Sequence, residues 1–127
     1  MTNKKKAENA PRFEGYIRIT EGFIFESGRS TILSAGLMDA YEDDALAVRL
    51  TYPLNLQDGK HDLIYPDDYN NPGIKWGIFL AGHGGEAKNG NLNFELSNSG
   101  RTAVGKFTFN YESGQVIKGI LKIKRFD

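Results

Sequence analysis

Apolar and polar side chains alternate through the last third of the chain, and this alternation constrains the fold more than any other feature of the sequence. Phe107 and Phe109 alternate with lysine, threonine and asparagine, and the same period of two continues through residues 92–97 and 116–126. Successive side chains of a β-strand point to opposite faces, so this period is typical of a strand with one buried face. Short turns that contain glycine separate the three segments. The sequence therefore predicts a three-stranded antiparallel meander here.

Less regular alternation extends upstream. Residues 13–25, 46–52 and 74–80 alternate in the same way, and residues 61–65 form a shorter segment between a glycine and a proline. Residues 36–46 leave two alternatives open. Leu37, Tyr41 and Ala45 are spaced by four, which fits a short amphipathic helix. Alternatively, residues 31–38 form a strand and residues 39–44 its hairpin loop, which the acidic residues of the loop favour.

Together these segments predict an all-β protein with eight or nine strands and at most one short helix. Twist accumulates across a sheet of this size, which must close on itself or split into two packed layers. The expected fold is an antiparallel β-sandwich or a small closed up-and-down barrel of the calycin-like type. Residues 12–127 fit a single domain, whereas the polar, lysine-rich residues 1–11 are expected to be disordered.

Composition and charge exclude several classes of function. The chain has no cysteine, which excludes disulfides, thiolate catalysis and cysteine-based metal sites. It has no apolar stretch typical of a signal peptide or a membrane span, so we expect a cytoplasmic protein without membrane contact unless a leader has been removed. Net charge is zero, which disfavours nucleic-acid binding.

The charge is nevertheless split along the chain. Residues 39–68 contain eight acidic and two basic residues, and residues 101–127 contain six basic and two acidic residues. A split of this kind favours contact with an oppositely charged partner protein or with a second copy of the chain.

No set of residues points to catalysis. His61 stands beside Asp62 and His83 lies in a glycine-rich stretch, but no serine occupies the Gly-x-Ser-x-Gly turn of a hydrolase. Residues 82–85 resemble a phosphate-binding loop without the helix that such loops need, and a flexible connection explains them better. Acidic residues at 42–44 and 67–68 lack the spacing of a calcium loop. We therefore predict a protein that is not an enzyme and has no catalytic residues, metal ligands or cofactor.

Aromatic residues near the middle of the chain indicate a candidate ligand site. Tyr65, Tyr69 and Trp76 bracket a proline-containing loop, residues 66–73, in which Asp68 and Asn70 lie. Exposed rings beside such polar side chains suit the binding of a sugar. Trp76 is assigned instead to the core, because it shares the register of neighbouring apolar residues. The candidate ligand-binding residues are thus Tyr65, Asp68, Tyr69 and Asn70.

The outward positions of the last two strands carry a row of lysines, namely Lys106, Lys118, Lys122 and Lys124. A lysine row either contacts an acidic partner protein or keeps an edge strand from pairing with its neighbours. These four lysines are the candidate protein-contact residues.

The leading functional hypothesis is a non-enzymatic binding or interaction module that contacts another protein or itself through charged loops and an exposed sheet face. One alternative is a small β-barrel that binds an apolar or amphiphilic small ligand, since aromatic residues and glycines along the strands suit a cavity. The other is a carbohydrate-binding domain centred on Tyr65, Asp68 and Tyr69.

Overall fold

The described part of the chain forms two antiparallel β-sheets. The computed structural model describes residues 12–22, 30–34, 36–43, 46–68, 76–80 and 83–126. Sheet A has the order β1-β10-β9-β8-β5 and sheet B the order β2-β3-β4-β6-β7. Sheet A consists of β1 (Arg12–Glu21), β5 (Gly59–Tyr65), β8 (Asn89–Ser97), β9 (Thr102–Asn110) and β10 (Val116–Phe126). Sheet B consists of β2 (Ser30–Ser34), β3 (Leu37–Asp43), β4 (Leu46–Thr51), β6 (Gly77–Leu80) and β7 (His83–Glu86).

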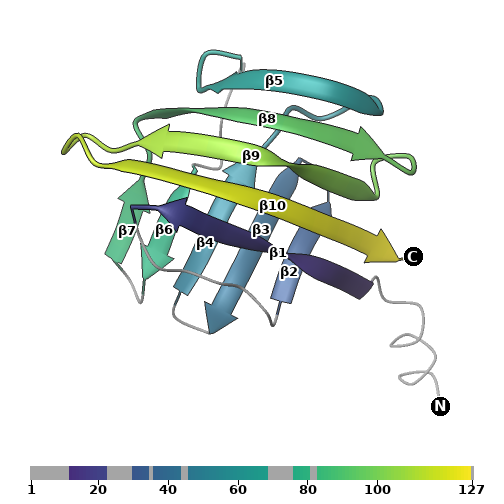
Figure 1. Cartoon of the computed structure of the whole chain (residues 1–127), viewed down its shortest axis with the longest axis horizontal. Helices are drawn as coiled ribbons and strands as arrows, with labels where there is room; N and C mark the ends of the chain where they lie inside the picture. The colour runs from purple at the N-terminus through teal and green to yellow at the C-terminus, as the bar shows by residue number, and fades with distance from the viewer. Residues whose placement is uncertain are drawn as a thin grey trace.

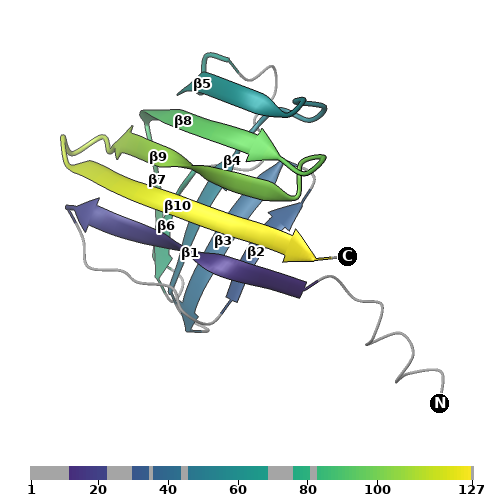
Figure 2. The same cartoon turned by 45° about the vertical axis from the view of Figure 1, so that its right-hand side comes forward.

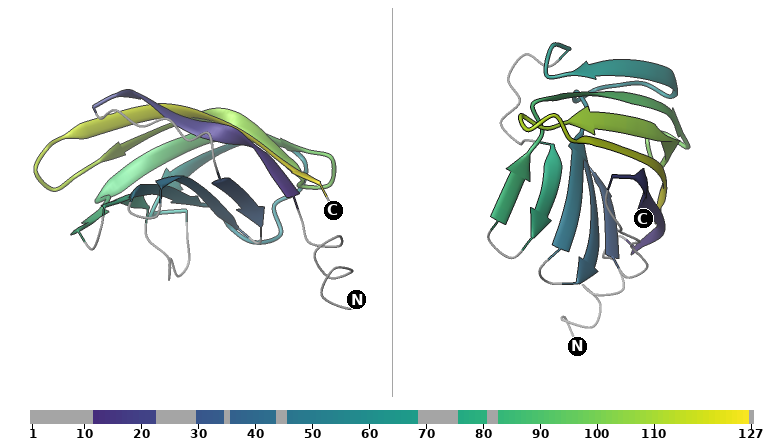
Figure 3. Two further views of the ribbon diagram at one scale, coloured as in Figure 1. Left: turned by 90° about the horizontal axis from the view of Figure 1, so that it is seen from below. Right: turned by 60° about the vertical axis from the view of Figure 1, so that its left-hand side comes forward.

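The two sheets lie face to face as two layers, and their strands cross at a steep angle (Figures 1 and 3). They approach each other along β1 and β10 of sheet A and β2 of sheet B, as the rotated view also shows (Figure 2). Neither sheet closes on itself, because within the described ranges β1 and β5 are unpaired edges of sheet A and β2 and β7 are unpaired edges of sheet B. The all-β, antiparallel prediction is confirmed, and the closed barrel is wrong.

The strand count exceeds the expected eight or nine, since the described residues contain ten strands and no helix. Neither alternative for residues 36–46 is correct. The chain turns at Gly36, where φ is +84°, and then runs as strand β3 and strand β4. The stretch expected to be a flexible connection contains β7, whose glycines pair with β6. The hydrogen bonds between paired strands need only backbone N–H and C=O groups, so a glycine-rich stretch can extend a sheet.

The inner faces of both sheets supply the core. The C-terminal meander is confirmed, with β8 paired to β9 and β9 paired to β10 in the expected order. Buried apolar residues from sheet A are Ile17, Ile19, Leu92, Phe94, Leu96, Ala103, Phe107, Phe109, Ile117, Leu121 and Ile123. Those from sheet B are Leu33, Met38, Ala40, Val48, Leu50 and Ile78. The intervening side chains of sheet A point to its other face, so the sequence alternation reports the inside and outside of that sheet.

Trp76 connects the two sheets. It is fully buried, and its ring stacks on that of Tyr65 at the end of β5, with 4.5 Å between ring centroids. Its indole N–H donates to Thr51 Oγ1 on β4 at 2.9 Å, and its carbonyl accepts from Ala87 N at 2.8 Å. A Cβ on Gly90 of β8 would lie 2.9 Å from the ring. The prediction that Trp76 belongs to the core is confirmed.

Strand β1 approaches β10 closely at Gly15. Its φ is +130°, and a Cβ there would overlap the carbonyl oxygen of Lys122 and lie 2.9 Å from Ile123 Cα. A side chain at this position is therefore excluded twice, by the left-handed backbone and by the neighbouring strand.

We expect Gly15→Ala to lower the free energy of unfolding by about 2–4 kcal/mol, combining the cost of the backbone conformation with that of the steric overlap. Gly114→Ala is the matched control, because Gly114 also has a positive φ, +92°, but nothing lies within 4 Å of its Cβ position. The control should lose only about 1 kcal/mol. Urea denaturation measures both, and equal losses would contradict the close approach of β1 to β10.

Candidate protein-interaction surface

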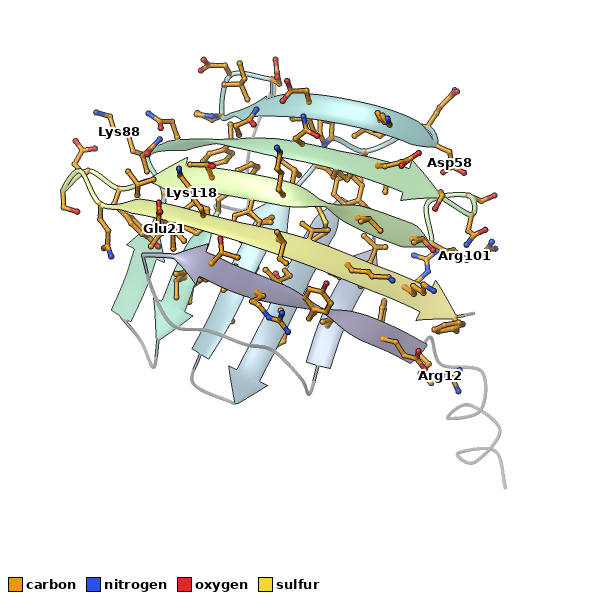
Figure 4. The ribbon with its side chains drawn as sticks, in the orientation of Figure 1. Arg12, Glu21, Asp58, Lys88, Arg101 and Lys118 are labelled. Carbon is orange, nitrogen blue, oxygen red and sulfur yellow. The ribbon has the colours of Figure 1, made fainter. Side chains whose placement is uncertain are left out.

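The outer face of sheet A, turned toward the viewer in Figure 4, is rich in charged side chains. Its exposed basic residues are Arg12, Arg18, Lys60, Lys106, Lys118, Lys122 and Lys124. Its exposed acidic residues are Glu14, Glu21, Asp62 and Glu95. Seven basic residues against four acidic ones give this face a positive charge, although the whole chain is neutral.

Three of the predicted lysines surround apolar side chains at the centre of this face. Lys122 lies between Tyr16 on β1 and Val104 on β9, and Lys106 lies beside Ile120 on β10. Val104 is 45% exposed and gives this part of the face an apolar surface between the lysines. We call the group formed by Lys106, Lys122, Lys124, Tyr16, Val104 and Ile120 the lysine patch. None of its three lysines forms an ion pair with another residue of the described ranges.

Tyr16 is held in position by a neighbouring cation. The guanidinium of Arg18 lies over its ring, 5.0 Å from the centroid. Such a cation–π contact stabilises an exposed pair by about 0.5–1 kcal/mol. The ring therefore lies within the patch as an ordered aromatic surface.

Lys118 differs from the other three predicted lysines. Its Nζ lies 3.6 Å from a carboxylate oxygen of Glu21 on β1, and the two side chains are labelled at the same end of sheet A in Figure 4. Both are more than half exposed, so the pair contributes little to stability. Its charge is partly neutralised, and we do not include it in the patch.

The predicted ligand residues do not form an exposed aromatic site in the described part of the chain. Tyr65 is only 2% exposed, so the expectation that its ring faces solvent is wrong. Burial raises the pKa of its hydroxyl. Asp68 is exposed, but its Oδ2 accepts a hydrogen bond from Ile64 N at 2.6 Å, and its own N–H donates to Ile64 O at 2.8 Å. Tyr69 and Asn70 lie outside the described residues.

His61 is not arranged with Asp62 as the sequence suggested. His61 and Asp62 point to opposite faces of β5, because they are consecutive in a strand. His61 Nε2 lies 2.6 Å from Gln57 O, and its ring packs on Phe94 with 5.6 Å between centroids. Asp62 instead accepts a hydrogen bond from Asn91. The described residues contain no group of three or more histidine or acidic residues that could hold a metal ion.

One buried charged group was not expected from the sequence. Asp39 is 1% exposed, and Arg49 donates to both of its carboxylate oxygens at 2.8 Å. Tyr41 also donates to Asp39 at 2.8 Å. The pKa of Arg49 is raised, chiefly by its hydrogen bond to Asp39, and the pKa of Tyr41 is raised, chiefly by burial. Of the two alternatives for residues 36–46, the favoured one puts Asp39 in a hairpin loop, because the pairing of Asp39 with Arg49 across β3 and β4 leaves no local signal in the sequence.

Comparisons with known proteins assign neither a family nor a function to the chain. No protein family model matches the sequence, and searches of curated proteins and of solved structures gave no significant match. In the described ranges, no helix is long and apolar enough to cross a membrane.

We expect Arg49→Met to lower the free energy of unfolding by about 3–5 kcal/mol, because it leaves the Asp39 carboxylate buried without a counter-charge. The double variant Asp39→Leu/Arg49→Met removes both charges and should recover most of this loss. Urea denaturation of the two variants checks the expectation. A loss below about 1 kcal/mol for Arg49→Met would indicate a solvated surface pair instead.

Proposed function

We propose that this chain is a non-enzymatic interaction module whose lysine patch contacts an acidic surface of a partner protein. The observation that carries the proposal is that Lys106, Lys122 and Lys124 form no ion pair among the described residues and lie around an exposed Val104 and partly buried Tyr16 and Ile120. The scaffold is proposed to be an open sandwich of two crossed sheets, in which sheet A presents its outer face to the partner.

The composition of the patch suits a protein interface. An interface of this kind has an apolar centre that includes an aromatic residue, surrounded by polar groups that fix orientation. Tyr16, Val104 and Ile120 supply the centre, and the lysines surround it. Unpaired exposed charges attract an oppositely charged partner over several ångströms and speed its association. The partner surface is therefore expected to carry carboxylates around an apolar group.

A rigid sheet also favours this function. The patch residues lie on three adjacent strands, β1, β10 and β9, whose backbones are fixed by ladder hydrogen bonds. A site on ordered strands loses little conformational entropy when a partner binds. The three lysines are exposed, so most of the affinity should come from the apolar centre and most of the salt dependence from the lysines.

The two alternative functions have less support. A ligand inside a barrel needs an enclosed space, whereas the sheets are open and their facing side chains are large and buried. A sugar site centred on Tyr65 needs an exposed ring, whereas that ring is stacked on Trp76.

We expect the triple variant Lys106→Glu/Lys122→Glu/Lys124→Glu to lose acidic proteins that the immobilised wild-type chain captures from cells that produce it. Each reversal replaces an attraction with a repulsion. Affinity for an acidic partner should fall by about fivefold for each ~1 kcal/mol of binding free energy that is lost. Quantitative mass spectrometry of the captured proteins measures the loss. Raising the ionic strength to about 1 M, where the Debye length is about 3 Å, should release the same proteins.

Lys88→Glu is the matched control for a single charge reversal. Lys88 precedes β8 and is 59% exposed, but it lies 4.0 Å from Glu112 and outside the patch. Its variant should capture the same proteins as the wild type, while Lys122→Glu alone captures less. Equal capture by the wild type and the triple variant, or capture unaffected by salt, would overturn the proposal.

A further inference from the structure

Strand β5 is an edge of sheet A with a short stretch of open backbone. Among the described residues, it pairs with β8 on one side only. In an antiparallel ladder, every second residue directs its N–H and C=O away from the neighbouring strand. Ile64 does so, because both its N–H and its C=O bond to Asp68. By the two-residue repeat, the N–H and C=O groups of Lys60 and Asp62 also point to the free edge.

The open stretch is limited at both ends. At the C-terminal end, Asp68 occupies the edge-facing groups of Ile64. At the other end the strand begins at Gly59, so Asp58 lies outside it, and the Asp58 carboxylate already accepts from the backbone N–H groups of Ser99 and Gly100 at 2.9 and 2.8 Å. The open edge within strand β5 therefore consists of residues 60–62.

We infer that two copies of this chain pair edge to edge through β5, in an antiparallel register centred on His61. This register places Lys60 of each copy opposite Asp62 of the other. Both residues direct their backbone groups to the edge, so each Lys60–Asp62 pair exchanges two hydrogen bonds, four in all. Their side chains lie on the outer face, where the two opposite-charge pairs stabilise the contact.

Other symmetric registers are excluded by the same residues. A register centred on Lys60 sets two lysines against each other, and one centred on Asp62 sets two aspartates against each other, which destabilises a cross-strand pair. A register centred on Leu63 requires the backbone groups of Ile64 that Asp68 already occupies. The charges of Lys60 and Asp62, together with the Ile64 groups that Asp68 occupies, thus select the register centred on His61.

The Asp62 side chain is already ordered for this contact. Its Oδ1 accepts a hydrogen bond from Asn91 Nδ2 at 2.7 Å, on the neighbouring strand β8. Oδ2 has no partner in the described part of the chain and is available to Lys60 of the second copy. Holding one oxygen reduces the entropy lost when the pair forms.

Pairing through β5 joins two five-stranded sheets into one. The two-fold axis of an antiparallel pair is perpendicular to the sheet, so both outer faces lie on the same side. Two lysine patches then share one surface. The inference does not depend on the proposed function, because β5 and the lysine patch are separate sets of residues.

We test the pairing with charge variants of the full chain, using sedimentation velocity over a range of concentrations. The wild type should form dimers. Lys60→Asp and Asp62→Lys should each weaken dimerisation by about tenfold, because each sets like charges across both pairs. The double variant Lys60→Asp/Asp62→Lys restores opposite charges and should restore the dimer. Lys122→Glu should leave the dimer intact, which separates this test from that of the lysine patch.

A second test uses the absence of cysteine from the chain. In the proposed register the two copies of His61 form a non-hydrogen-bonded pair, with Cα atoms about 4.5 Å apart, within the range of a disulfide. His61→Cys should therefore form a disulfide-linked dimer under mild oxidation. Leu63→Cys, on the same face but away from the axis, should not. A monomeric wild type, a dimer insensitive to both charge variants, or equal cross-linking of the two cysteine variants would overturn the inference.

Discussion

The stack of Trp76 on Tyr65 joins the two sheets on the β5 side of sheet A, away from β1, β10 and β2, where their strands approach. Tyr65 ends an edge strand of sheet A, and Trp76 precedes the first residue of β6 in sheet B. A stacked aromatic pair contributes about 0.5–1.5 kcal/mol beyond the apolar area it buries. The indole N–H would be costly to bury without an acceptor, and Thr51 of β4 supplies one. A single residue thus ties together strands that are distant in sequence and belong to different layers.

Because the two sheets face each other, each strand has one set of side chains between the sheets and one set on the outside. Residues that face the other sheet are apolar and buried, so they stabilise the fold and are not available to a partner. A partner can therefore bind only at the outer faces of the sheets or at their open edges. The lysine patch lies on the outer face of sheet A, and β5 is one of its open edges. The edge pairing that we infer would place two patches on one continuous surface.

Sequence alternation was sufficient to predict the all-β class, the C-terminal meander, the burial of Trp76 and the exposure of the lysines. Predictions from this alternation were wrong where the structure depends on contacts between residues distant in sequence. The buried charge of Asp39 fits neither alternative for residues 36–46, because its counter-charge, Arg49, lies on another strand. Tyr65 was expected to be exposed because its neighbours are polar, and only the position of Trp76 explains its burial. The closed barrel was wrong because alternation shows which face is buried but not which edges pair.

The most direct measurement is the fluorescence of Trp76, since it is the only tryptophan in the chain. If the stack joins the sheets, emission from the native protein should lie at shorter wavelength than emission from the urea-unfolded chain, and acrylamide should quench it far less. Native emission at the wavelength of the unfolded chain, with equal quenching by acrylamide, would contradict the buried contact on which the arrangement of the two sheets depends.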